Sequence, residues 1–237
     1  MVCINNAKLF HEVLFSSPCL RPGHGHQLMS FVNCRSAAEG YNEAVHLARY
    51  PWLVYVHQDV FLPPGWDAQF LAGIRAAERL FPRLAIVGVY GIGQNELGQT
   101  HRLGEVYDRD RWLKEAHPLP AQARSLDELC FAVRRDSGLV MDPGLGFDFY
   151  ATDLVLQASA LGLQAAVVHA PCRHQSGLPR EGLSEVFLTR FERSARHFAQ
   201  KWHQCLPVTT PCIHLGGMRP VEDEIAAALA GVGREEI

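Results

Sequence analysis

Short apolar runs in this chain alternate with longer segments in which apolar residues recur every three or four positions. The run Leu53–Val56 is too short for a helix and is typical of a buried strand. It is followed by three polar residues, His57, Gln58 and Asp59, and then by a Pro-Pro-Gly turn. Apolar residues at helical spacing over residues 66–81 predict a helix after the turn. The pattern therefore predicts a strand that presents polar side chains at its carboxyl end.

The same two periodicities predict the other elements. Further strands are expected at residues 2–4, 28–32, 84–90, 130–133 and 165–168. Further helices are expected at residues 36–49, 150–161, 183–202 and 225–229. The first of these helices begins with Ser36 and Glu39, which match a capping box. Residues 91–122 and 136–149 are rich in glycine and are interpreted as loops, with a small hairpin at 105–112.

The alternation of strands and helices in the first half predicts a mostly parallel central sheet with helices on both faces. Ligands of such sheets bind outside the carboxyl ends of the strands, which makes Asp59 the first candidate site residue. The second half is less regular, and we expect it to add a mixed strand pair and helices that wall a cleft. The expected fold is one α/β domain.

Composition and charge exclude several classes of partner. Of the 237 residues, 48% are hydrophobic and 20% are charged, as in an ordinary globular protein. The formal net charge of −3 argues against a broad surface for nucleic acid or anionic membranes. The sequence has no run of about 18 apolar residues and no signal-peptide layout at its start. We therefore expect a cytoplasmic protein with no nucleic-acid partner and no membrane span.

Seven cysteines are present, an odd number without a Cys-x-x-Cys pair. Three of them stand two residues from a histidine, in Cys172-x-His174, His203-x-Cys205 and Cys212-x-His214. These spacings do not match those of structural zinc sites. Reduced thiols scattered through the protein are the better interpretation.

Three polar residues, Asp59, Asp153 and His174, stand where a buried element meets a loop. Carboxylate and imidazole together are ligands that Mn²⁺ or Mg²⁺ accepts, usually with substrate phosphates completing the shell. Such an ion would neutralise charge on a departing diphosphate, and Asp153 could accept a proton from an attacking hydroxyl. Each residue also has a structural interpretation: a turn former, a carboxylate favoured at a helix N-terminus, and a loop histidine.

The order of the motifs resembles the GT-A glycosyltransferases, in a family-2-like branch where His-Gln-Asp-Val replaces the usual Asp-x-Asp. The matching stretches are Asn5-Asn6, Ser36–Glu43, His57–Val60 with Trp66, Phe147–Leu154 and His174–Gly177. The resemblance covers roughly residues 1–178 and implies a GT-A-like, Rossmann-like catalytic domain there. Residues 179–237 are then expected to form a C-terminal helical extension packed on the same domain.

The resemblance implies a role for each matching residue. Asp59 would hold the metal ion on the diphosphate of a sugar nucleotide, and His174 would complete the metal shell. Asp153 would be the catalytic base of an inverting transfer. Contacts to the nucleotide sugar are implied for Asn5, Asn42, His57, Gln58 and Asp59.

Asp148, in the Gly- and Pro-rich loop, is a candidate for binding an acceptor hydroxyl and equally for forming a turn.

The leading expectation is a glycosyltransferase that uses Mn²⁺ or Mg²⁺ to move a sugar from a nucleotide-diphosphate donor to a hydroxyl of a saccharide or other acceptor. One alternative is a sugar-phosphate nucleotidyltransferase, whose glycine-rich basic loop after the first strand does not match residues 5–8. The other is a non-catalytic nucleotide- or carbohydrate-binding module. It would fit Thr152, where many relatives carry an acid, whereas the presence of Asp59, Asp153 and His174 together argues against it.

Overall fold

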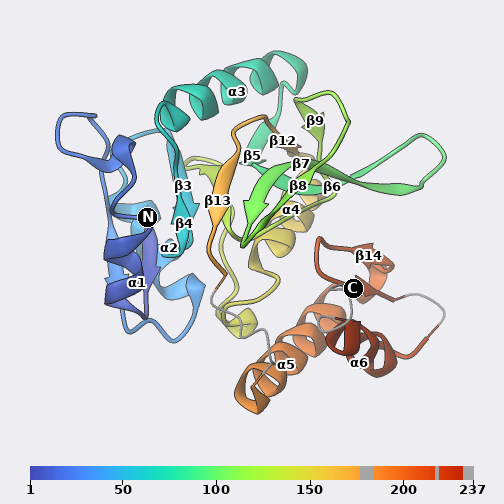
Figure 1. Cartoon of the computed structure of the whole chain (residues 1–237). Helices are drawn as coiled ribbons and strands as arrows, with labels where there is room; N and C mark the ends of the chain where they lie inside the picture. The colour runs from blue at the N-terminus through green and yellow to red at the C-terminus, as the bar shows by residue number, and fades with distance from the viewer. Residues whose placement is uncertain (177–183, 217–218, 232–237) are drawn as a thin grey trace.

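The computed structural model describes residues 1–176, 184–216 and 219–231. Its helices are α1 (Ala7–Glu12), α2 (Ala37–Leu47), α3 (Trp66–Leu80), α4 (Tyr150–Ala160), α5 (Glu185–Lys201) and α6 (Val221–Gly231), with 3-10 turns η1 (Pro18–Leu20), η2 (Pro143–Leu145) and η3 (His203–Cys205). Figure 1 shows α3 along one edge of the strands, with α1 and α2 on one side and α5 and α6 on the other. Among the described residues, none of the helices combines the length and apolar character needed to cross a lipid bilayer.

Two mixed sheets occupy the centre of the molecule. The first has the order β3 (Trp52–Val56), β11 (Cys130–Arg134), β5 (Leu84–Gly88), β12 (Gln164–Val167) and β9 (Ala121–Gln122). The second has the order β10 (Ser125–Leu126), β6 (Tyr90–Gln94), β7 (Thr100–Asp108), β13 (Cys172–His174) and β4 (Val60–Phe61), and β8 (Arg111–Lys114) pairs with β7. Two small sheets pair β1 (Val2–Ile4) with β2 (Ser30–Val32), and β14 (Val208–Thr209) with β15 (His214–Leu215).

The expectation of a mostly parallel sheet is wrong. β11 lies between β3 and β5 and runs antiparallel to both, and in the second sheet only the β7–β13 contact is parallel. A parallel neighbour requires a crossover connection, usually a helix. Between β5 and β11 the chain instead runs through strands β6 to β10, without a helix, and β11 then runs in the direction opposite to β5.

The interpretation of residues 91–122 as a loop is also wrong, because β6, β7 and β8 lie within this segment. The glycines in this segment let neighbouring strands pack closely, because they have no Cβ atom. A Cβ atom would stand 2.4 Å from the Ser125 carbonyl oxygen at Gly91, and 2.1 Å from the Val89 carbonyl oxygen at Gly104. The hairpin expected at 105–112 is confirmed as β7–β8, with Tyr107 opposite Trp112.

Helices cover both faces of the first sheet, and the predicted periodicities account for their buried sides. In α3, the buried residues are Trp66, Phe70, Ile74 and Ala77, as the spacing predicts. The capping box expected before α2 does not form. Ser36 makes no capping bond through its side chain, and the Glu39 carboxylate accepts the backbone N–H of Arg35 at 2.7 Å instead. Tyr150 begins α4, also as expected.

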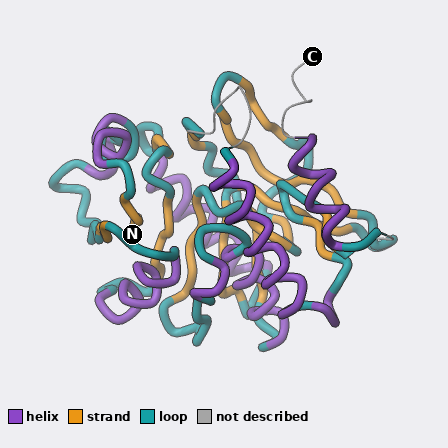
Figure 2. The backbone as a smooth tube through the Cα atoms, turned by 90° about the horizontal axis from the view of Figure 1, so that it is seen from below, coloured by secondary structure: helices purple, strands orange, loops and turns teal. Residues whose placement is uncertain are grey.

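The last part of the chain contains α5, α6 and the β14–β15 hairpin, so it is only partly helical. These elements share a third apolar cluster with Leu145 of η2 and Phe149, which precedes α4. Seen from below in Figure 2, helical segments lie on the near side of the sheet strands. The expected start of the long helix at residue 183 lies outside the described residues, and the domain division at residue 178 stays a prediction.

Candidate metal centre

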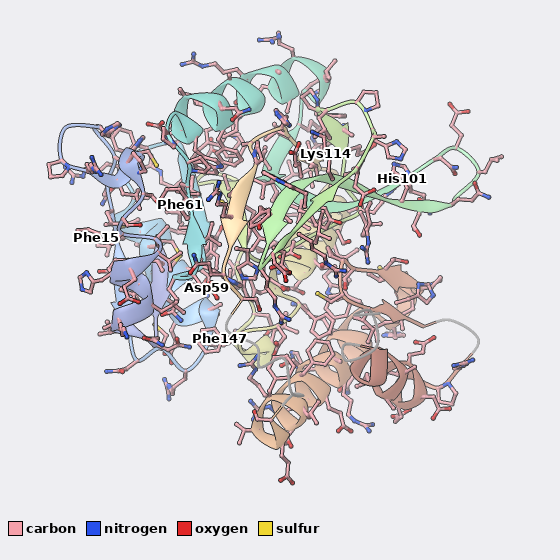
Figure 3. All side chains as sticks on the ribbon, in the orientation of Figure 1. Phe15, Asp59, Phe61, His101, Lys114 and Phe147 are labelled. Atoms are coloured by element: carbon pink, nitrogen blue, oxygen red, sulfur yellow. The ribbon has the colours of Figure 1, made fainter. Side chains whose placement is uncertain are left out.

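Three sequence-predicted residues meet where β3, β4 and β13 come together. His57 and Asp59 lie in the turn between β3 and β4, and His174 is the last residue of β13. The antiparallel β4–β13 pair sets His174 opposite Val60, and the Gln175 N–H donates to the Asp59 carbonyl at 2.8 Å. One potential ligand atom from each of His57, Asp59 and His174 lies within 4.8 Å of the other two. Figure 3 labels Asp59 near the middle of the molecule.

His174 lies between two carboxylates. Its Nε2 is 3.6 Å from Asp59 Oδ1, and its Nδ1 is 2.9 Å from Asp108 Oδ1. Asp108 is placed by the parallel pairing of β7 with β13, in which it is the direct partner of His174. A carboxylate on the far nitrogen of a metal-binding histidine fixes the orientation of the ring and raises its basicity. Asp108 is therefore a site residue that the sequence analysis did not identify.

The two carboxylates control the charge of His174. Burial alone would lower the pKa of His174, but the contacts of its ring N–H groups with the accepting carboxylates of Asp108 and Asp59 outweigh this effect and raise the pKa to about 10. Burial has the opposite effect on a carboxyl group and would raise the pKa of Asp59. The contacts of Asp59 with His174 and His57 outweigh this effect, so its pKa is lowered overall. Without a metal ion, His174 carries a proton at neutral pH, and a bound cation would take the place of that proton.

His57 has the opposite electrostatics. Burial lowers its pKa to about 4, so the ring is neutral at neutral pH and keeps a lone pair for a cation. Its Nε2 lies 2.6 Å from the hydroxyl oxygen of Tyr150, at the start of α4. When Nε2–H donates to this oxygen, Nδ1 carries the free lone pair. Tyr150 is thus a second site residue that the sequence analysis did not identify.

The residues of the triad, His57, Asp59 and His174, fit a divalent cation. One carboxylate oxygen and two imidazole nitrogens form a donor set that Mn²⁺ accepts. Neighbouring ligands of an octahedral ion with bonds of about 2.1 Å stand roughly 3 Å apart. The 3.6 Å between His174 Nε2 and Asp59 Oδ1 reaches that spacing with small side-chain rotations. Three protein ligands leave positions open for phosphate oxygens or water.

The predicted nucleotide contacts Asn5, Gln58 and Asn42 are placed differently. The Gln58 amide bonds within the protein, because its Oε1 accepts the N–H groups of Asn5 at 3.1 Å and Asn6 at 2.9 Å, and its Nε2 bonds Asn5 Oδ1. Asn42 bonds both backbone groups of Met141, at 2.9 and 3.1 Å. The amides of Gln58 and Asn42 therefore hold backbone segments together, and a role of these residues toward a nucleotide stays a prediction.

Asp153, the predicted base, is completely buried. Its Oδ1 accepts from Trp202 Nε1 at 2.8 Å and pairs with Lys201 Nζ at 2.7 Å, and its Oδ2 accepts from Gln157 Nε2 at 2.7 Å. With these donors in place, neither oxygen is open to an acceptor hydroxyl. The described conformation therefore makes Asp153 a link between α4 and the end of α5.

Asp148 and Asp142 also bind α5. Arg190 donates to both carboxylate oxygens of Asp148, at 3.0 and 3.1 Å. Asp142 pairs with Lys201 at 2.8 Å and with His197 at 3.2 Å. Acceptor binding by Asp148 stays a prediction that requires the Arg190 contact to open.

Two further acids, Asp127 and Glu128, lie in the turn before β11 and are only half-buried. Burial, followed by the charges of Asp127 and Asp148, raises the pKa of Glu128 well above its usual range, while the N–H groups of Phe149 and Ala151 partly compensate. Glu128 thus lies at the N-terminus of α4. Burial also raises the pKa of Asp127, and the charge of His174 opposes this rise. Asp127 therefore adds a carboxyl group near His174, and Glu128 adds one at the start of α4.

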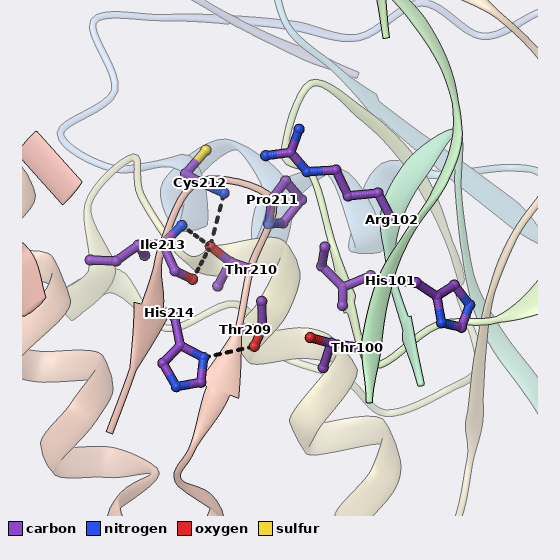
Figure 4. Close-up of a pocket in the computed structure, with 10 residues that line it drawn as sticks. Thr100, His101, Arg102, Thr209, Thr210, Pro211, Cys212, Ile213 and His214 are labelled. Atoms are coloured by element: carbon purple, nitrogen blue, oxygen red, sulfur yellow. Dashed lines mark hydrogen bonds between the residues drawn. The ribbon is translucent and has the colours of Figure 1, made fainter. Parts of the chain in front are cut away.

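A cavity of about 320 Å³ lies elsewhere, between the β6–β7 hairpin and residues 209–214. Figure 4 shows its lining, in which Thr210 bonds the backbone of Cys212 and Ile213, and Thr209 bonds His214. The triad does not contribute to this lining. The candidate metal centre and this cavity are therefore separate.

Comparisons with known proteins identify a family and a similar fold. Residues 1–181 match the model of a glycosyltransferase like family. A mannosyltransferase from Pyrobaculum calidifontis, solved in complex with GDP-Man and Mn²⁺, has a similar fold, with a TM-score of 0.52 and 13% identity over 99% of this chain and 69% of that one. At this identity the likeness shows the fold alone.

A curated relative from Fuscovulum blasticum, described as ORF 6 of the ATP synthase subunits region, is 25% identical over 162 residues. The matched region covers 66% of this chain and 61% of the relative, whose description states no activity. The narrower assignment to a branch with His-Gln-Asp-Val stays a prediction. Because the family model covers most of the sequence, the chain belongs to the glycosyltransferase-like family.

Proposed function

We propose that the protein is a metal-dependent glycosyltransferase that moves a sugar from a nucleoside-diphosphate donor to an acceptor hydroxyl. The observation that carries the proposal is the convergence of His57, Asp59 and His174, with Asp108 behind His174. A bound Mn²⁺ or Mg²⁺ supplies charge neutralisation for the departing diphosphate. Membership of the family and the fold shared with a mannosyltransferase support the same reaction class.

The protein's own residues bind and orient in this proposal. Asp59 and the two histidines hold the cation, and Asp108 keeps the ring of His174 turned toward it. Tyr150 keeps the His57 ring in place through the 2.6 Å contact. Because β3, β4, β7 and β13 position these side chains, the centre rests on sheet strands and the short turn between two of them.

An inverting transfer also needs a carboxylate that takes the proton of the acceptor hydroxyl. Asp153 would need Lys201 and Trp202 to release it before it could act. Glu128 lies at the N-terminus of the same helix and is only half-buried, so its carboxyl group is more accessible to an acceptor hydroxyl than the completely buried Asp153. We therefore assign the proton acceptor to Glu128 and a positioning role to Asp153.

The proposal is tested by calorimetric titration of UDP and GDP, each with and without Mn²⁺. Wild type is compared with Asp59→Ala and with Asp136→Ala, which removes an exposed carboxylate away from the centre. The expected result is Mn²⁺-dependent binding of at least one nucleotide by wild type and Asp136→Ala, and its loss in Asp59→Ala. Equal nucleotide binding by all three proteins, with no effect of Mn²⁺, would contradict the proposal.

A further inference from the structure

A second cluster of metal-ligating side chains lies away from the triad, between a loop and the start of α3. The sequence Gly-His-Gly-His over residues 23–26 brings two imidazoles to Asp67, in the first turn of α3. His26 Nε2 is 3.0 Å from Asp67 Oδ2, and His24 Nδ1 is 3.7 Å from the same oxygen. One ligand atom from each of the three residues lies within 4.8 Å of the other two.

The loop that carries the two histidines is fixed in place by other contacts. Tyr50 donates its hydroxyl to the Gly25 carbonyl at 2.8 Å. Gln27 donates to the Leu47 carbonyl at 2.9 Å and accepts the Arg49 N–H at 2.9 Å. Gly25 has a φ of +75°, a backbone conformation that side chains disfavour and that a tight turn requires. These hydrogen bonds fix the backbone that carries the two imidazoles, as a binding site requires.

The spacing of the ligand atoms fits a tetrahedral ion. Zinc bonds of about 2.0–2.1 Å to nitrogen and oxygen place neighbouring tetrahedral ligands roughly 3.4 Å apart. The two measured separations, 3.0 and 3.7 Å, lie on either side of that value. Two imidazoles with one carboxylate are also a ligand set that zinc uses in proteins, with water in the fourth position.

We propose that His24, His26 and Asp67 form a zinc site that ties the loop at residues 21–29 to the N-terminus of α3. The imidazole side chains are about half exposed, at 45%, so the ion can enter from solvent. The negative charge of Asp67 is balanced by the ion, and the ion joins two segments 41 residues apart in the sequence. The site does not depend on the proposed transfer activity, since it shares no residue with the triad.

The test is a titration of Zn²⁺ against a competing chromogenic chelator at neutral pH. All proteins carry Asp59→Ala, which removes a ligand of the triad and isolates the second site. The first protein has no further change, the second adds His24→Ala and His26→Ala, and the matched control adds His46→Ala and His203→Ala, two exposed histidines outside the cluster. Melting temperature is measured with Zn²⁺ and with a chelator for each protein.

The first and control proteins are expected to bind one more equivalent of Zn²⁺ than the His24→Ala/His26→Ala protein, and to show a Zn²⁺-dependent rise in melting temperature that this protein lacks. Loss of two ligands should weaken binding by more than the roughly 10- to 100-fold that the loss of an outer-shell partner costs. The same Zn²⁺ stoichiometry and affinity in all three proteins would overturn the proposal. Because the double variant changes only exposed side chains, it is expected to fold.

Discussion

The Asp108→Asn substitution tests how the second carboxylate controls the metal centre. In wild type, His174 has a pKa of about 10, so a cation must displace a proton at any lower pH. Each pH unit below that pKa weakens apparent metal binding roughly tenfold. Between pH 7 and pH 9, Mn²⁺ affinity should therefore rise by about two orders of magnitude.

The substitution keeps the shape of the side chain and an oxygen that accepts from His174 Nδ1, but it removes the charge that raises the pKa of His174. The rise in affinity should then level off at a lower pH. Corrected for the proton that each protein must release, the variant should bind Mn²⁺ about 10- to 100-fold more weakly than wild type, because the ring of His174 is less basic. Toward neutral pH this deficit should shrink, because the variant holds the competing proton less tightly.

The assay is calorimetric titration of Mn²⁺ in anaerobic buffers at a series of pH values from 6 to 9, below the range in which Mn²⁺ precipitates as its hydroxide, with Asp136→Asn as the control for loss of an exposed carboxylate. The control should follow wild type throughout. A wild-type affinity that does not change with pH over this range would refute the reasoning. Parallel curves for wild type and Asp108→Asn would refute it as well, since Asp108 would then have no part in the protonation of His174.

Three further predictions follow from the same contacts. Lys201→Met leaves the buried Asp153 carboxylate without its cation and should destabilise the protein by about 3 kcal/mol in urea unfolding. Lys8→Met, which breaks the exposed pair with Glu12, should cost under about 1 kcal/mol, and equal losses in the two variants would contradict the prediction. Glu128→Gln should lower the turnover of sugar transfer about 10²- to 10⁴-fold and leave nucleotide binding intact. If Asp153→Asn instead loses more turnover than Glu128→Gln, at unchanged stability, Asp153 is the base. Without metal, stability from protonated His174 should be fully present below pH 6.5 and decline as the pH rises toward about 10, and thermal melts of His174→Gln in a chelator should lack this decline.

The part of the site that could be predicted from sequence lies next to local signals. His57 and Asp59 follow a buried apolar strand directly, and His174 comes a few residues after the strand predicted at 165–168. Their convergence also depends on the short strand β13, which the sequence analysis did not predict and which pairs antiparallel with β4. Asp108 gave no such signal, because the sequence predicts only a small hairpin at 105–112 and does not indicate which strand this hairpin pairs with. Its contact with His174 is set by the register of β7 on β13, across 66 residues of sequence. Sequence patterns do not encode that register.

The partners of Asp153 could not be predicted from its local sequence either. An acid in the first turn of a helix has the same local sequence whether it faces a cleft or a neighbouring helix. Its partners, Lys201 and Trp202, lie almost 50 residues later, at the end of α5. The antiparallel direction of β11 was missed because it depends on a long connection. The chain passes from β5 to β11 through strands and not through a crossover helix.

The most direct test of the central claim is pulsed EPR of Mn²⁺ bound to the protein together with a nucleoside diphosphate. If the triad holds the cation on the diphosphate, the spectrum should show couplings to histidine nitrogen and to phosphorus at once, and the nitrogen coupling should fall in His174→Gln. A Mn²⁺ signal with phosphorus coupling and no histidine nitrogen in wild type would mean that the nucleotide alone carries the ion, and that result would contradict the account.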